Sequence, residues 1–113
     1  MIAMSVSLAG QWRIVETSAW SRDHLDLCGP AFLRIGTDGT GEMAFGALTA
    51  ALDGGFTNSG IDFEWNGADE GDQVTGSGWA DLHDDGRLQG EIAYENGDET
   101  TFIAEPWPFS AAC

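Results

Sequence analysis

The feature that most constrains this chain is a clean alternation of apolar and polar residues that begins at Ile61. Apolar Ile61, Phe63 and Trp65 recur at every second position, with polar side chains between them. A period of two places alternate side chains on opposite faces of a β-strand, so this stretch predicts a half-buried strand. In the stretch that follows, the inward positions carry mostly small side chains: Val74, Gly76, Gly78, Ala80 and Leu82. We therefore expect a hairpin over 61–82 in which an aromatic strand lies beside a nearly bare one.

Shorter versions of this pattern, separated by turn-forming residues, cover much of the remaining chain. Further strands are expected at 10–17, 31–35, 42–52, 87–95 and 99–105. The Asp38-Gly39 pair predicts a tight hairpin turn, because glycine takes positive φ at no steric cost. Alternation weakens after Gly46, which indicates a bulge or bend within the strand at 42–52. The segment 53–60 is rich in turn formers and is expected to be a loop.

One short helix is expected after the first strand. Ser21 can cap it by accepting a bond from a backbone amide, and Leu25 and Cys28 fall on one side of it. Gly29-Pro30 would end it sharply. This helix would lie over one end of the fold as a lid.

The fold class that follows is all-β. About seven short strands joined by tight turns should pair in order as an antiparallel meander. Closing such a meander into a small barrel removes exposed strand edges. A two-sheet β-sandwich fits the same periodicity and stays open as the alternative. With 113 residues the chain is expected to be one domain over 1–113, with an ordered core at about 10–105 and flanking tails at 1–9 and 106–113.

The charge of the chain excludes several classes of partner. Asp and Glu number 19 against four Arg and no Lys, for a formal charge of −15. Such a surface repels the phosphates of nucleic acids and of anionic membranes, so we expect neither as a partner. It suits either a soluble, well-solvated protein or one that binds a basic protein partner. No signal-like start and no apolar run of about 20 residues is present, so a cytoplasmic location is expected.

Motifs for catalysis or metal binding are missing from the sequence. There is no nucleophile elbow, phosphate loop, dinucleotide fingerprint or paired-cysteine metal motif. His24 and His83 are far apart and have no ligand spacing, so we expect no metal site and no cofactor. His24 neighbours Asp23, but adjacent residues on a helix do not face one another. The sequence therefore favours a protein without catalytic residues that is not an enzyme.

The inward aromatic and glycine residues have two interpretations. Large side chains packed against small ones can fill a core densely. Alternatively, the missing side chains leave a cavity in the barrel mouth for a small apolar or aromatic ligand. The residues expected to line such a cavity are Trp12, Phe63, Trp65, Tyr94, Gly76 and Gly78.

Two aromatic residues fall out of phase with the inward faces. Phe32 is opposed to Leu33 and Ile35, and Trp79 lies between Gly78 and Ala80. Exposed aromatic side chains on strands mark either a homodimer interface or a surface covered by another segment, such as the leader or the tail at 106–109.

Several runs together resemble a known group of proteins. They are Gly-Gln-Trp-Arg-Ile at 10–14, Thr-Asp-Gly-Thr-Gly-Glu at 37–42, Gly-Ser-Gly-Trp-Ala at 76–80 and Asp-Gly-Arg-Leu-Gln-Gly at 85–90. Over 10–104 the chain resembles a family of short, acidic bacterial proteins of unknown function, which implies no activity. More loosely, Gly10 and Trp12 on a first strand, followed by a lid and a meander, are similar to the calycins (lipocalins, fatty-acid-binding proteins and avidins). That resemblance implies a ligand-binding barrel.

Two functions follow from these observations. The first is a non-enzymatic binding module that holds a small apolar or aromatic ligand in the barrel mouth. The alternative is an acidic protein-interaction module, such as an inhibitor, an immunity protein or a nucleic-acid mimic. An internal void lined by aromatic residues would favour the first, and a dense core with carboxylates gathered on one outer face would favour the second.

Overall fold

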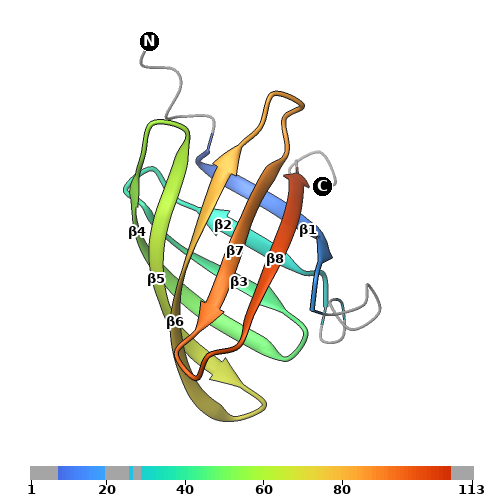
Figure 1. The fold of residues 1–113 in the computed structure, drawn as a ribbon, viewed down its shortest axis with the longest axis vertical. Coiled ribbons are helices and arrows are strands. Elements are labelled where there is room, and N and C mark those ends of the chain that lie inside the picture. The colour runs from blue at the N-terminus through green and yellow to red at the C-terminus, as the bar shows by residue number, and fades with distance from the viewer. Residues whose placement is uncertain (1–7, 20–25, 27–28, 108–113) are drawn as a thin grey trace.

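The protein is a closed β-barrel. The computed structural model describes residues 8–19, 26 and 29–107 (Figure 1). Its eight strands are β1 (Gly10–Thr17), β2 (Phe32–Ile35), β3 (Thr40–Phe45), β4 (Leu48–Phe56), β5 (Gly60–Asp69), β6 (Asp72–Leu82), β7 (Leu88–Tyr94) and β8 (Glu99–Pro106). Each strand pairs antiparallel with the next, and β8 pairs with β1 to close the barrel. The predicted all-β meander is confirmed, in its barrel form.

One expected strand is in fact two. The segment 42–52 belongs to β3 and β4, which are joined at Gly46-Ala47 with Phe45 paired opposite Leu48. Gly46 has a φ of +59°, and glycine at the first central position is the preference of a type II′ hairpin turn. The weak alternation after Gly46 therefore marks a reversal of the chain, and the predicted single strand with a bulge or bend is wrong. Apolar residues on both sides of the turn concealed the change of direction.

The loop predicted at 53–60 is also shorter than expected. Strand β4 continues to Phe56 and β5 begins at Gly60, so three residues connect them. Gly54 and Gly55 lie within β4 because β5 supplies a partner along its whole length, from Leu48 opposite Asp69 to Phe56 opposite Ile61. Pairing with a long neighbour has overridden local turn preference here.

The predicted hairpin of β5 and β6 is confirmed, and it is the longest strand pairing of the barrel. It runs from Gly60 opposite Asp81 to Asp69 opposite Asp72. Its tight turn is Glu70-Gly71, with φ of 55° and 88°, a pair of positive values typical of a type I′ turn. The connection within the predicted hairpin over 61–82 is thus only two residues long.

The core fills the inside of the barrel. Its buried members come from every strand and include Trp12, Ile14, Leu33, Met43, Leu52, Phe63, Trp65, Ala80, Ile92 and Phe102. Leu8, which precedes β1, is buried as well and accepts a hydrogen bond from Trp12 Nε1 at 3.1 Å. This side-chain bond ties the start of the described chain to the barrel.

The predicted helix falls mainly on residues 20–25 and 27–28, which lie outside the described residues. Within the described ranges the chain forms strands, turns and bends, and no helix. Accordingly, no helix of membrane-spanning length and hydropathy is found among those residues.

Candidate functional site

Five of the six residues predicted to line a ligand cavity come together inside the barrel. Trp65 lies opposite Gly76 and Phe63 opposite Gly78 across the β5–β6 pairing. A Cβ atom added to Gly76 would lie 2.6 Å from Trp65 Cζ2, and one added to Gly78 would lie 2.7 Å from Phe63 Cζ. Such distances are shorter than carbon atoms tolerate, so the two rings already occupy the space above the glycines. The large and small residues interdigitate.

Tyr94 completes this inner cluster. Its ring meets that of Trp65 edge-to-face, with the ring centroids 5.0 Å apart. The hydroxyl donates to Asp69 Oδ2 at 3.4 Å. Burial and the nearby Asp69 carboxylate both raise the pKa of Tyr94, so the phenol stays a neutral donor at physiological pH.

Trp12, the sixth predicted residue, comes from β1 and belongs to the same buried core as Phe63, Trp65 and Tyr94. Strand β1 is separated from β5 by three strands in either direction around the closed barrel. The Trp12 indole is buried and donates to Leu8, a bond that satisfies its one polar atom. Binding of a ligand by this set stays a prediction.

The outward side of the same strands carries a concentration of carboxylates. Two cross-strand rows are set by the pairing of β4 through β8: Gly55, Asp62, Trp79, Glu91 and Thr101, and beside it Asp53, Glu64, Ser77, Ala93 and Glu99. We call these positions the acidic face. Its charged members are all Asp or Glu, and none of its positions holds Lys or Arg.

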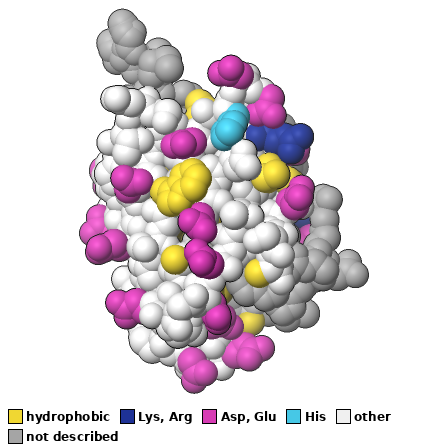
Figure 2. Space-filling model, viewed as in Figure 1, with side chains coloured by type: hydrophobic (Ala, Val, Ile, Leu, Met, Phe, Trp, Pro, Cys, Tyr) yellow, Lys and Arg dark blue, Asp and Glu magenta, His cyan; other side chains and the backbone are white. Residues whose placement is uncertain are grey.

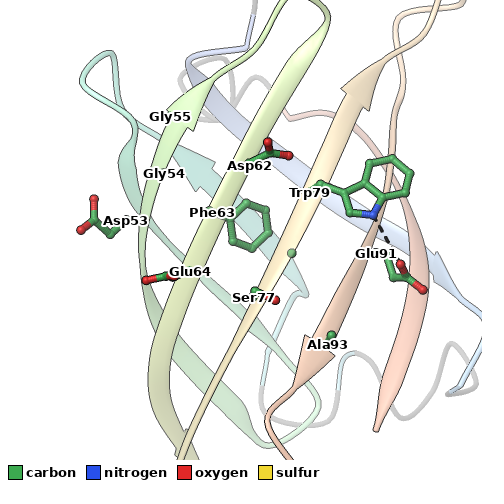
Figure 3. A pocket seen from close by; sticks show the side chains of 11 residues that line it. Asp53, Gly54, Gly55, Asp62, Phe63, Glu64, Ser77, Trp79, Glu91 and Ala93 are labelled. Carbon is green, nitrogen blue, oxygen red and sulfur yellow. Dashed lines mark hydrogen bonds between the residues drawn. The ribbon is translucent and has the colours of Figure 1, made fainter. Parts of the chain in front are cut away.

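Trp79 is the large hydrophobic side chain that stands exposed on this face, with 41% of its surface accessible. Its indole Nε1 donates to Glu91 Oε1 at 3.3 Å, which orients the ring (Figure 3). Phase alone predicted the outward direction of Trp79, and the structure confirms it. In Figure 2 acidic side chains are spread over the visible surface, and hydrophobic ones are isolated.

A hollow of about 420 Å³ lies in the acidic face beside Trp79. Small outward residues make it, since Gly55, Ser77 and Ala93 leave the surface low there. Around it stand Trp79 and the carboxylates Asp53, Asp62, Glu64 and Glu91. Figure 3 shows Asp53 and Glu64 on one side of the hollow and Trp79 with Glu91 on the other. A small group bound in the hollow would contact an aromatic ring and several carboxylates at once.

Glu91 also interacts with the neighbouring acid Glu99. A hydrogen bond between the two carboxyl groups, together with their mutual repulsion, raises the pKa of Glu99 above its usual range. Two carboxyl groups this close hold a proton more readily than either would alone. A cation placed between them would relieve the repulsion in the same way.

Phe32, the other predicted interface residue, lies on the opposite side of the barrel from Trp79. Three strands separate β2 from β6 in either direction. Trp107 packs on Phe32 with ring centroids 6.3 Å apart, and the Arg13 guanidinium lies 5.8 Å from the Trp107 ring. Arg13 in turn pairs with Asp26 at 2.8 Å. Phe32 and Trp79 therefore belong to two different surfaces.

Sequence reasoning did not identify the acidic face. The outward phase of Asp62 and Glu64 was visible, but alternation does not tell which residues of other strands stand beside them. Within the described residues, no group of three or more His, Cys, Asp or Glu side chains is arranged to hold a metal ion.

Comparisons of the chain with protein-family models, with curated proteins and with solved structures find no match. The two resemblances noted from the sequence therefore stay predictions.

Proposed function

We propose that this protein is a non-enzymatic binding module that recognises a basic segment of a partner protein through its acidic face. The observation that carries the proposal is the exposed indole of Trp79, set beside a hollow whose charged residues are all carboxylates. An exposed indole with carboxylates around it is a good arrangement for binding a cation.

Arginine is the side chain that fits this site best. Tryptophan offers the strongest cation–π surface of the aromatic residues, and a guanidinium stacks on such a ring. Its fork of donors can bond carboxylates at the same time. Glu91 orients the Trp79 ring, and Asp62 and Glu64 also line the hollow. A guanidinium bound there would therefore stack on the ring and bond carboxylates at the same time.

The packing of the core supports this function over the apolar ligand. Trp65 and Phe63 occupy the space that Gly76 and Gly78 would otherwise leave for a guest. A ligand there would have to displace rings that are already buried. The acidic face requires no rearrangement of the barrel.

Titration calorimetry with a peptide of alternating arginine and glycine tests the proposal. Trp79→Ala should weaken binding about fivefold, the equivalent of ~1 kcal/mol for an exposed cation–π contact. The double variant Asp62→Asn/Glu64→Gln should weaken it further. Glu16→Gln/Asp84→Asn removes the same charge from exposed positions elsewhere and is the matched control.

Equal losses of peptide affinity in the two double variants would mean that net charge alone attracts the peptide, and would contradict the assignment of binding to the acidic face. So would tight binding of the peptide by Trp79→Ala. A glutamate–glycine peptide of the same length should not bind.

A further inference from the structure

The hollow beside Trp79 continues along β6 and β7 into a second one. The second hollow has a volume of about 520 Å³ and reaches Thr75 and Glu95. The two hollows share four lining residues: Asp53, Glu64, Ser77 and Ala93. We call the combined hollow, from Trp79 to Thr75 on β6 and from Glu91 to Glu95 on β7, the trough. In Figure 3 the small side chains Ser77 and Ala93 follow Trp79 and Glu91 along the two strands and form its floor.

Each end of the trough has a glutamate that a side chain of β6 holds in place. At one end the Trp79 Nε1 atom donates to Glu91 Oε1 at 3.3 Å. At the other end the Thr75 hydroxyl donates to Glu95 Oε1 at 2.8 Å, and the backbone amide of Glu95 donates to the Thr75 carbonyl at 2.9 Å. A carboxylate that is already held by a neighbour loses less freedom when it binds a guest. The trough therefore presents two prepared carboxylates, one at each end.

No basic residue of the described chain lines this trough. The chain has no Lys, and the three described arginines each have a carboxylate partner outside the trough: Arg13 with Asp26, Arg34 with Glu42, and Arg87 with Glu105. The carboxylates of the trough thus have no counter-charge among the described residues. Basic side chains of another molecule would supply it.

The spacing of the two ends determines which conformation of a partner fits. Thr75 and Trp79 lie four residues apart within β6, which is about 13 Å along a strand. In an extended peptide, residues four apart point to the same side and are separated by the same distance. In an α-helix, residues four apart are separated by only about 6 Å along the axis. An extended segment with two basic residues four apart therefore matches both ends.

We infer that the basic segment binds in an extended conformation along β6 and β7, with an arginine at Trp79 and a second basic side chain four residues away at Glu95. This inference rests on the proposed function and adds to it the spacing and the conformation of the partner. The end at Glu95 has no exposed aromatic ring on which a guanidinium could stack, so lysine serves there as well as arginine.

Titration calorimetry at ~0.15 M NaCl with three arginine–glycine peptides of equal length tests the inference. One peptide has two arginines four residues apart, one has them three apart, and one has a single arginine. The four-apart peptide should bind at least about threefold more tightly than the three-apart peptide, because odd spacing turns the second side chain away from the trough in an extended chain. The three-apart peptide should bind about as weakly as the single-arginine peptide.

Variants at the second end show where the preference arises. Glu95→Gln should abolish the preference for four-apart spacing and leave the affinity for the single-arginine peptide unchanged. Thr75→Val removes the hydroxyl that holds Glu95 and should reduce the preference. Glu16→Gln removes the same charge from an exposed position on β1 and should keep the preference. Thermal melts show that each variant is folded.

The outcomes separate this inference from the proposed function. Equal binding of the two-arginine peptides by the wild-type chain would overturn the inference, and so would a preference that persists in Glu95→Gln. In both cases the proposed function stands as long as Trp79→Ala still weakens binding of the single-arginine peptide. Binding of all three peptides that is indifferent to Trp79→Ala would overturn the proposed function and this inference together.

Discussion

The acidic face and the outer surface next to it are built in part by the same strands, yet they differ in charge. On β4 the acidic face contributes Asp53 and the neighbouring surface Ala51, and on β5 the corresponding residues are Glu64 and Asn66. A step of two residues, about 7 Å along a strand, changes the surface from strongly acidic to uncharged. Outward positions of a barrel strand are free to differ in this way because they take no part in the core.

The inward side of these strands shows the opposite behaviour. Phe63 and Trp65 pack against Gly78 and Gly76 so closely that neither glycine could carry a Cβ atom without a clash. The pairing of β8 with β1 closes the barrel around them. Neither outer face can rearrange without disturbing that packing. The comparison teaches that one rigid interior can present two chemically unrelated surfaces.

The largest effect is expected from a substitution that disturbs the interior beneath both faces. In Gly78→Ala the new methyl would lie 2.7 Å from both Phe63 Cζ and the Glu91 carbonyl oxygen. Overpacking of this kind should lower the free energy of unfolding by about 1–3 kcal/mol. Urea denaturation measures the change.

Gly55→Ala is the matched control for that experiment. A methyl added at Gly55, on the outer surface of β4, meets nothing within 4 Å. This variant should be at least as stable as the wild-type chain. A Gly78→Ala variant as stable as Gly55→Ala would contradict the dense interior described above.

The next effect is that of salt on binding at the acidic face. As the ionic strength rises from ~0.01 to ~0.15 M, the Debye length falls from about 30 to about 8 Å. Binding of the arginine–glycine peptide should weaken by about tenfold over that range. Calorimetry at the two ionic strengths measures the change, and binding that does not weaken would show that the carboxylates of this face do not attract the peptide.

A smaller effect is expected from pH at the acidic face. The raised pKa of Glu99 means that this group favours the unfolded chain when it is ionised. Stability should therefore increase as pH falls through the folded pKa of Glu99, and the gain is complete below its unfolded pKa. Glu99→Gln should be more stable than the wild-type chain at neutral pH, by a margin that disappears in acid. Thermal melts across this pH range measure the margin.

Glu16→Gln controls for the loss of one negative charge in general. If its stability changed with pH just as that of Glu99→Gln does, the interaction between Glu91 and Glu99 would not be the cause.

The smallest effect concerns the exposed ion pair of Arg34 and Glu42, on the surface next to the acidic face. Arg34→Gln removes the partner of Glu42 and should change the free energy of unfolding by no more than about 0.5 kcal/mol. Peptide binding at the acidic face should be unchanged. A large loss of stability would show that the pair supports the fold itself.

Much of the fold could be predicted from local pattern. The alternation at Ile61, Phe63 and Trp65 placed β5 correctly, and the phase of Trp79 placed its side chain outside. Turn chemistry was less reliable. It predicts a bulge or bend at Gly46 and a loop at Gly54, because local preference does not reveal whether a neighbouring strand is available to pair with.

The candidate site depended on register, which alternation does not contain. Asp53, Glu64, Ser77, Ala93 and Glu99 come from five strands and become one row only when the hairpins set their offsets. Nothing in the spacing of these residues along the chain brings them together.

The sequence by itself thus determined that this protein is a β-barrel or sandwich, strongly acidic, with an aromatic strand beside a strand rich in glycine. Those properties are local or additive, so they can be summed from the residues. Only the tertiary structure decided that the rings of Trp65 and Phe63 fill the space beside Gly76 and Gly78. It also decided that carboxylates lie around Trp79, while the alanines of β3, β4 and β5 lie on another part of the outer surface. These facts depend on which strands meet and at what offset, and closure of the barrel sets both.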